Sequence, residues 1–271
     1  MKKAPSGIWQ SLLIVMAVIV TYSQSLYGPF LLDDNWKIVR NPVVRGQAPV
    51  PVTSRYLCDQ SFRLNYQWGG MNTGAWRIVN VLIHAAAGVI LYRLLARVHS
   101  LRSGKDLRTC LSVSGPSLWV AFLWVLHPVQ TESVAYICQR FESLAGLFYL
   151  LTVYGFVRAV SGSHRWYRIS VLACICGMAT KETVATAPLV ILLLDGAVLS
   201  VSWREALRRN WRLHAGYVLT WGVLAVLWFG TMAEGIRAGE YGAAVLSPWR
   251  YWLTQNAVVV HYLRLALFPV G

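Results

Sequence analysis

Three clusters of ionisable side chains interrupt a chain that is otherwise strongly apolar. Each cluster offers carboxylates, and two of them add a lysine or an arginine. A carboxylate can deprotonate an incoming hydroxyl as a general base, and lysine or arginine can neutralise a phosphate leaving group. The sequence therefore predicts transfer of a group from a phosphate-linked donor to a hydroxyl acceptor. The candidate residues are Asp33 and Asp34, then His127, Glu132 and Arg140, and finally Lys181 and Glu182.

The second cluster lies in the segment HPVQTESVAYICQRFES at residues 127–143. Pro128 suits the start of a helix. Glu132, Tyr136 and Arg140 follow one another at intervals of four, and positions four apart share one face of a helix. The spacing predicts a helix near the membrane surface that presents these three side chains together.

The composition identifies the kind of protein that must position these clusters. Of 271 residues, 56% are hydrophobic and 13% are charged, whereas soluble domains carry about 25% charged residues. The net charge is +14, but the cations lie between apolar runs, as membrane topology signals do. The sequence therefore indicates an integral membrane protein and argues against a nucleic-acid-binding one.

The apolar runs predict an all-helical fold with about eight transmembrane helices. A bilayer is crossed by about 20 apolar residues in a helix, and several of the runs are shorter than that. Lys2 and Lys3 precede the first run without a convincing cleavage site after it, so we expect an uncleaved first helix. The expected helices are 8–28, 76–97, 115–128, 143–160, 169–180, 183–200, 214–233 and 250–269.

The distribution of cations predicts the orientation. If the eight segments alternate, Lys2 and Lys3 share one side with the basic stretches 93–108, 158–168 and 204–212. Cytoplasmic loops carry the excess of lysine and arginine, so the N-terminus is expected in the cytoplasm. All three polar clusters then face the opposite, outer side.

The fifth and sixth segments, 169–180 and 183–200, could also form one helix interrupted by Lys181 and Glu182. A single span would place two arginine-rich loops on opposite sides of the membrane, against the positive-inside rule. We therefore expect two helices that meet at a turn, with Pro188 inside the second. Lys181 and Glu182 would then lie in a protein-lined cavity, because exposing such charges to lipid is costly.

The first outer loop, about 29–75, is the only long one. Its last part, 54–70, mixes aromatic and cationic residues as interfacial helices do. None of the five cysteines has metal-ligand spacing. A disulfide between Cys58 and Cys138 is weakly supported, because the only argument for it is that both are expected on the same side of the membrane. No cofactor is required by these residues, although a divalent cation near the carboxylates is compatible with them.

Carboxylates, cations and an apolar groove at the outer face suit glycosyl transfer from a polyprenyl-phosphate sugar. Structural alternatives are a solvated aspartate pair, a noncatalytic interfacial helix and an ion pair that closes a helical hairpin. His84 and His261, on apolar helices, are expected to be packed rather than to bind metal. Two other functions also fit: a carrier of polyprenyl-linked or anionic lipids, and a noncatalytic membrane scaffold.

Several segments, taken in order, resemble a known family. FLLDDNWKIVRNP, SFRLNYQWGGMNTGAWRIVNVLIHA, HPVQTESVAYICQRFESLAGLFYLL and GMATKETVATAPLVILLLD are similar to the membrane half of the transmembrane-and-tetratricopeptide-repeat protein O-mannosyltransferases and their bacterial relatives. That family belongs to the GT-C class of glycosyltransferases. The resemblance runs from about residue 27 to the end of the chain, and its most specific parts are the Asp-Asp pair and the HPVQTE block.

The resemblance implies a role for each cluster. Asp33 or Asp34 would be the catalytic base, and Glu132 and Arg140 would contact the acceptor or the carrier phosphate. Lys181 would bind the phosphate, and Glu182 would orient that lysine. The donor would be a polyprenyl-phosphate monosaccharide and the acceptor a protein serine or threonine, on the non-cytoplasmic face.

The chain departs from the family pattern in two places. Arg77 stands where relatives often have a histidine, so the role of that histidine cannot be transferred. The sequence stops at Gly271 without a tetratricopeptide repeat, which predicts a truncated chain comprising the N-terminal part of the membrane domain. With no eukaryotic retention or glycosylation signal evident, we expect a bacterial inner membrane, or the endoplasmic reticulum membrane in a eukaryote.

Overall fold

The computed structural model describes residues 7–111, 115–163, 165–200, 202–237 and 248–269. Over these residues the chain is helical and contains no strand, which confirms the all-helical prediction. Lys2, Lys3 and Gly271, which the topology and truncation predictions invoke, lie outside them. The α-helices are α1 Ile8–Tyr22, α2 Tyr56–Gly69, α3 Thr73–Ser103, α4 Leu107–Cys110, α5 Pro116–Val125, α6 Gln130–Ala135, α7 Arg140–Val160, α8 Arg165–Met178, α9 Ala187–Leu194, α10 Trp203–Arg237 and α11 Pro248–Leu267.

Short tighter or wider turns extend several of these helices. The 3-10 helices are Ser23–Tyr27, Ile137–Gln139 and Glu182–Thr186, and the π-helical turns are Asn35–Val39 and Asp195–Leu199. With these extensions, 5 helical stretches within the described residues are long and apolar enough to cross a membrane. They are Ile8–Tyr27, Thr73–Ser103, Ile137–Val160, Glu182–Leu199 and Trp203–Ile236.

The predicted count of eight spans is therefore not confirmed, although each predicted segment contains a helix. The apolar α5 has 10 residues, and α8 has 14. At a rise of about 1.5 Å per residue, both are shorter than the hydrocarbon core of a bilayer, which is about 30 Å thick. The membrane character of the protein follows from the five long helices.

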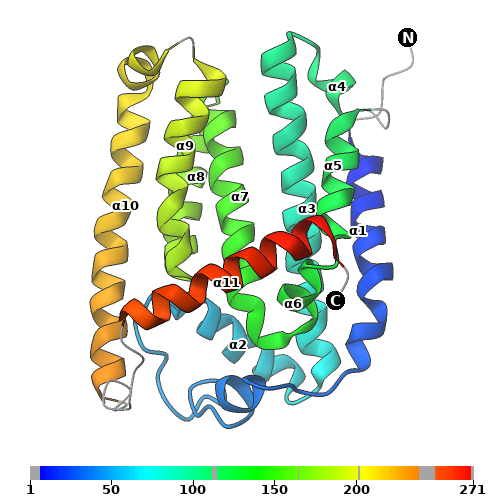
Figure 1. Ribbon diagram of the computed structural model, residues 1–271, viewed down its shortest axis with the longest axis vertical. Coiled ribbons are helices and arrows are strands. Elements are labelled where there is room, and N and C mark those ends of the chain that lie inside the picture. The colour runs from blue at the N-terminus through cyan, green and yellow to red at the C-terminus, as the bar shows by residue number, and fades with distance from the viewer. Residues whose placement is uncertain (1–6, 112–114, 164, 201, 238–247, 270–271) are drawn as a thin grey trace.

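The helices α3, α5, α7, α8, α9 and α10 run roughly side by side with α1 in Figure 1. Two buried clusters hold them together. One joins α7 and α8 to the neighbouring helices through side chains such as Phe156 and Met178, and the other joins α1, α3 and α5. Helices α7 and α8 approach closely because Gly155 lacks a side chain; a Cβ there would lie 2.7 Å from that of Ser170.

Helices α8 and α9 are separate, as the distribution of arginines predicted. Helix α8 ends at Met178, Lys181 is extended, and Pro188 occupies the first turn of α9. Consequently α8 and α10 both begin at the same end of the bundle, the upper end in Figure 1. That end collects the arginine-rich loops, and we call it the basic end; the opposite end, which carries α2 and α6, is here called the loop end. Which end faces the cytoplasm stays a prediction.

The continuous helix expected through the second polar cluster is not present. Helix α6 ends at Ala135, and Tyr136 adopts an extended conformation before the chain turns into α7. Glu132 and Arg140 therefore belong to different helices and do not share a face. The prediction from spacing by four was wrong because Tyr136 is extended and ends α6, so the helix does not continue to Arg140.

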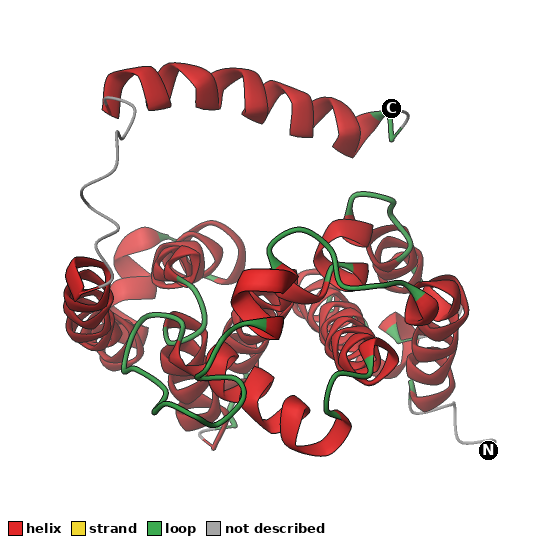
Figure 2. Cartoon of the chain, turned by 90° about the horizontal axis from the view of Figure 1, so that it is seen from below, coloured by secondary structure: helices red, strands yellow, loops and turns green. Residues whose placement is uncertain are grey.

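Helix α11 lies apart from the other helices and crosses the bundle obliquely (Figures 1 and 2). Most of its described side chains are exposed. Tyr262 reaches the bundle through a 3.1 Å hydrogen bond from its hydroxyl to Glu132 Oε2. His261 is exposed, so the prediction that it is packed was wrong, whereas buried His84 bonds the Val125 carbonyl at 3.0 Å as expected.

Candidate functional site

A cavity of about 200 Å³ opens at the loop end of the bundle. Four separate segments meet there: the turn after α1, the residue preceding α2, the α6–α7 junction and the α8–α9 turn. Asp33 and Lys181 both line the cavity, so the first and third polar clusters come together. We call it the Asp33 cavity. The full lining is Asp33, Lys37, Arg55, Tyr136, Cys138, Gln139, Phe141, Glu142 and Lys181.

Asp33 is held in place through its backbone. Leu32 has a φ of 39°, in the left-handed region that non-glycine residues rarely adopt, and the Asp33 N–H donates to the Tyr136 hydroxyl at 2.8 Å. Its side chain is exposed, and no described residue donates a hydrogen bond to its carboxylate. Strained backbone of this kind persists where surrounding contacts impose it, so the turn presents a free carboxylate to the cavity.

Asp34, its neighbour, points the other way and is fully buried. Its two carboxylate oxygens accept hydrogen bonds from the Leu31 N–H at 2.9 Å and the Cys138 N–H at 2.8 Å. Burial raises the pKa of Asp34, and these two bonds together with nearby Arg77 oppose that rise. The side chain therefore ties the turn after α1 to the α6–α7 junction.

Lys181 forms an ion pair with Glu142 at the N-terminal end of α7. The two side chains are 24% and 43% exposed, so both remain accessible to a ligand. Glu182 does not orient Lys181, contrary to the prediction: its carboxylate accepts from the Ser54 hydroxyl, which in turn contacts Thr231 at 3.0 Å. Lys181 is extended whereas Glu182 begins a 3-10 helix, and the two side chains have different partners.

Arg140, predicted to bind phosphate, is fully buried inside the bundle. Its guanidinium lies 4.8 Å from the centre of the Phe62 ring. Because every guanidinium nitrogen already donates to the protein, the arrangement leaves none for a ligand, and the residue joins α2, α3 and α7. The acceptors are Asn80 Oδ1 at 2.7 Å, Asn65 Oδ1 at 2.6 Å, the Trp76 carbonyl at 2.9 Å and the Ser61 carbonyl at 3.3 Å.

The remaining members of the second cluster lie outside the Asp33 cavity. Glu132 is exposed and accepts a 3.2 Å hydrogen bond from Gln139 Nε2, so it lies beside the cavity. His127 is half-buried and its Nδ1 accepts the Val129 N–H at 3.2 Å, which closes the turn before α6. The structure thus does not bring His127 to the other candidate residues.

Sequence reasoning missed three charged residues of the Asp33 cavity. Lys37 follows Asp33 by four residues, a spacing that would have placed it one helical turn away. Glu142 was overlooked inside the same block as Arg140, and Arg55 was attributed to an interfacial helix. Near the two cations, burial raises the pKa of Asp59 to about 6, and Lys37 and Arg55 oppose that rise.

Arg77, which replaces a histidine of the family pattern, has a structural setting of its own. It is 2% exposed and donates to the carbonyls of Gly28, Pro29 and Ala135, the last at 2.9 Å. These bonds anchor the segment that leads to Asp33. Arg77 therefore holds the backbone that leads to Asp33 in place and does not line the Asp33 cavity.

All five cysteines are free thiols, so the weakly supported alternative of a disulfide between Cys58 and Cys138 is not realised. Both are buried in one apolar cluster with Phe62 and Trp76. Within the described parts of the chain, no three histidine, cysteine, aspartate or glutamate residues lie together as metal ligands would.

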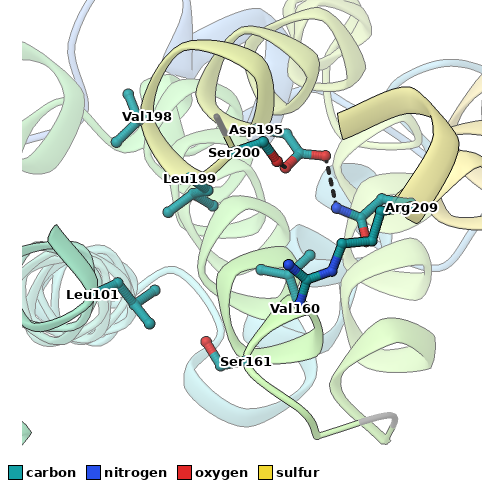
Figure 3. Close-up of a pocket in the computed structure, with 9 residues that line it drawn as sticks. Leu101, Val160, Ser161, Asp195, Val198, Leu199, Ser200 and Arg209 are labelled. Carbon is teal, nitrogen blue, oxygen red and sulfur yellow. Dashed lines mark hydrogen bonds between the residues drawn. The ribbon is translucent and has the colours of Figure 1, made fainter. Parts of the chain in front are cut away.

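A second cavity, of about 160 Å³, lies at the basic end around Asp195 (Figure 3). Asp195 is 1% exposed, and its carboxylate accepts from Ser200 Oγ at 3.0 Å, Asn210 Nδ2 at 2.9 Å and His214 Nε2 at 2.9 Å. Three side-chain partners saturate this carboxylate. The cluster joins the end of α9 to α10, and the oxygens of Asp195 are engaged by the protein's own donors.

The chain is similar to protein O-mannosyltransferases of animals. It is 30% identical to Protein O-mannosyl-transferase TMTC1 of Mus musculus over 213 residues, which cover 68% of this chain and 21% of that protein. The corresponding human protein is 29% identical over 222 residues, covering 71% of this chain and 24% of its own length. Protein O-mannosyl-transferase Tmtc2 of Drosophila melanogaster is 31% identical over 202 residues, 65% of this chain and 20% of that protein.

These matches confirm the resemblance inferred from the sequence segments. The chain spans between a fifth and a quarter of the length of these three relatives. No family model matches the chain, and no solved structure matches it.

Proposed function

We propose that the chain transfers a mannosyl group from a polyprenyl-phosphate donor to a protein serine or threonine hydroxyl, at the loop end of the bundle. The observation that carries the proposal is the Asp33 cavity, where one carboxylate without a hydrogen-bond donor among the described residues faces a set of cations. Similarity to proteins named O-mannosyltransferases supports the sugar and the acceptor class.

Asp33 is the proposed base, and Asp34 is not. A general base must reach the proton it removes, and Asp33 is exposed at the cavity whereas Asp34 is buried with both oxygens occupied. Asp33 would accept the hydroxyl proton while the hydroxyl oxygen attacks the anomeric carbon. The bond from that carbon to the phosphate oxygen breaks on the opposite side, so the configuration at the sugar inverts.

Lys37, Arg55 and Lys181 are proposed to bind the departing phosphate. All three line the cavity with Asp33, and cations placed where negative charge develops stabilise the transition state. The ion pair of Lys181 with Glu142 keeps the ammonium group within the cavity. Since three side chains supply positive charge, we propose that transfer proceeds without a divalent cation; treatment with EDTA should leave the rate unchanged.

The loop end is proposed to be the non-cytoplasmic end. The basic end carries the arginine-rich loops, and cytoplasmic loops hold the excess of such residues. A polyprenyl tail would remain in the bilayer beside the long helices while its phosphate enters the cavity. We also propose that the chain belongs to the GT-C class of glycosyltransferases. Its proposed location is the bacterial inner membrane, or the endoplasmic reticulum membrane in a eukaryote.

The direct test uses the full chain in liposomes containing polyprenyl-phosphate mannose, with radioactive mannose transferred to serine- and threonine-containing peptides as the readout. Asp33→Asn should abolish transfer, whereas Asp106→Asn, at the basic end, serves as the matched control. A lipid carrier would keep donor binding and movement in Asp33→Asn and would show no transfer in the unmodified chain. A noncatalytic scaffold would show no transfer in the unmodified chain or in either variant. Unchanged transfer in Asp33→Asn would overturn the assignment of the base.

A further inference from the structure

A further cavity, of about 260 Å³, adjoins the Asp33 cavity. The two cavities share Gln139 and Glu142 in their linings. The additional wall is formed by α6, which contributes Glu132 and Ser133, and by Tyr262 of α11. We call it the Glu132 cavity. The proposed roles of the Asp33 cavity, which are binding of the donor phosphate and removal of the hydroxyl proton, give no function to this second space.

The two cavities differ in charge. Three cations line the Asp33 cavity, whereas the ionisable side chains of the Glu132 cavity are two glutamates and one tyrosine. Glu142 is neutralised by Lys181. Glu132 accepts only neutral donors, Gln139 Nε2 at 3.2 Å and the Tyr262 hydroxyl at 3.1 Å, and no lysine or arginine in the described part of the chain pairs with it.

An unpaired carboxylate also affects its neighbour. Glu132 raises the pKa of the Tyr262 phenol, chiefly through the hydrogen bond between them. Glu132 is also exposed, so its carboxylate is accessible to a ligand. A cation of a bound ligand would form an ion pair with Glu132 that the protein itself does not supply.

We propose that the Glu132 cavity is the acceptor subsite and selects protein segments with a lysine or arginine close to the serine or threonine that receives the sugar. The inference rests on the proposed function and adds the charge of the acceptor to it. Gln139 separates the two cavities, so the acceptor hydroxyl would approach Asp33 from the side of α6 while the flanking cation lies at Glu132. A phosphate-bearing donor would be repelled from the same carboxylate and directed to the cationic cavity.

The test compares peptides that are identical except for one residue near the acceptor hydroxyl, which is lysine, glutamine or glutamate. The full chain in liposomes with polyprenyl-phosphate mannose should prefer the lysine peptide over the glutamate peptide by about 1.5- to fivefold, the range of an exposed ion pair. The preference should lie in KM, because the charge contacts the peptide equally before and during transfer.

Two substitutions of Glu132 sharpen the test. Glu132→Gln should make the KM values of all three peptides equivalent, and Glu132→Lys should reverse their order. Glu132 is exposed, so neither change should prevent folding. Asp106→Asn removes an equally exposed carboxylate at the basic end and should leave the preference unchanged.

Equilibrium binding of fluorescent versions of the peptides separates the subsite from the chemistry. Binding that favours lysine and loses this preference in Glu132→Gln, without any sugar transfer, would support the subsite and reject the proposed reaction. Equal binding and equal transfer of all three peptides by the unmodified chain would overturn the subsite and leave the reaction standing.

Discussion

The two ends of the bundle each place an aspartate at a cavity, but the two carboxylates are bonded differently. At the basic end, three side chains donate to Asp195, and one of them is the imidazole of His214. At the loop end, Asp33 is held by its backbone N–H and its carboxylate has no donor among the described residues. The cations near Asp33 line the same cavity without pairing with it.

The comparison shows that a carboxylate in a cavity is not by itself a reactive group. A carboxylate that accepts several hydrogen bonds is stabilised as the anion and is a weak base. The Asp195 cluster therefore has a structural role, in which it connects helices. A carboxylate fixed by its main chain keeps its oxygens for a substrate. Asp34 provides the same contrast one residue away, since it uses both oxygens on backbone N–H groups.

The largest expected effect comes from removing the free carboxylate. Asp33→Asn should lower kcat by about 10²- to 10⁴-fold, the usual contribution of a general base, with an unchanged unfolding midpoint. Asp195→Asn should leave kcat per folded molecule within about twofold because no reacting group touches that side chain. Measurement of transfer normalised to folded protein decides between them; a comparable loss in both variants would refute the contrast.

The next effect is the converse one, on stability. Asp195→Ala should lower the free energy of unfolding by about 3–5 kcal/mol, because it leaves a partly buried histidine and two other polar groups without their acceptor. Asp33→Ala, at an exposed position, should change it by less than about 0.5 kcal/mol. Denaturant unfolding in detergent, followed by tryptophan fluorescence, provides the measurement. Equal stabilities of the two variants would contradict the bonding pattern.

A smaller effect is expected for a cation of the Asp33 cavity. Lys181→Gln should reduce kcat/KM for the donor by about 10- to 100-fold, the value of one charge-assisted hydrogen bond of about 1.5–3 kcal/mol. The variant also leaves Glu142 unpaired, so the double variant with Glu142→Gln should recover part of the loss. Absence of any recovery would indicate that the ion pair does not position the lysine.

The smallest effect concerns pH and Asp59, which lies near Lys37 and Arg55. Its pKa is raised to about 6 in the folded chain, from an ordinary value of 3.8. Between pH about 4 and about 6 the folded chain therefore binds more protons than the unfolded chain, and stability falls as pH rises through that window. Asp59→Asn should reduce this slope, to which Asp34 also contributes because burial raises its pKa, and Asp106→Asn should retain it. The slope is measured by thermal unfolding at about pH 4.5 and 5.5, within the window, and at about pH 6.5, above it.

Much of the architecture could be predicted from local patterns. Apolar runs located the helices, and the arginine-rich loops correctly separated α8 from α9 at Lys181. Two expectations failed for one reason: a helix through Tyr136 and a phosphate contact by Arg140 both depended on where distant segments meet. Arg140 donates hydrogen bonds to side chains and a backbone carbonyl of α2 and α3, which lie 60 to 79 positions earlier in the chain.

Composition and spacing determined by themselves that the chain is a helical membrane protein and that carboxylates and cations gather at its turns. Hydropathy and charge act residue by residue, so they can be interpreted without a fold. Only the tertiary structure decided which aspartate is free, because Asp34 is occupied by a backbone N–H 104 positions away. It also decided that Lys181 pairs with Glu142 and that Glu132 stays unpaired, since the partners of a charge depend on which segments the packed helices bring together.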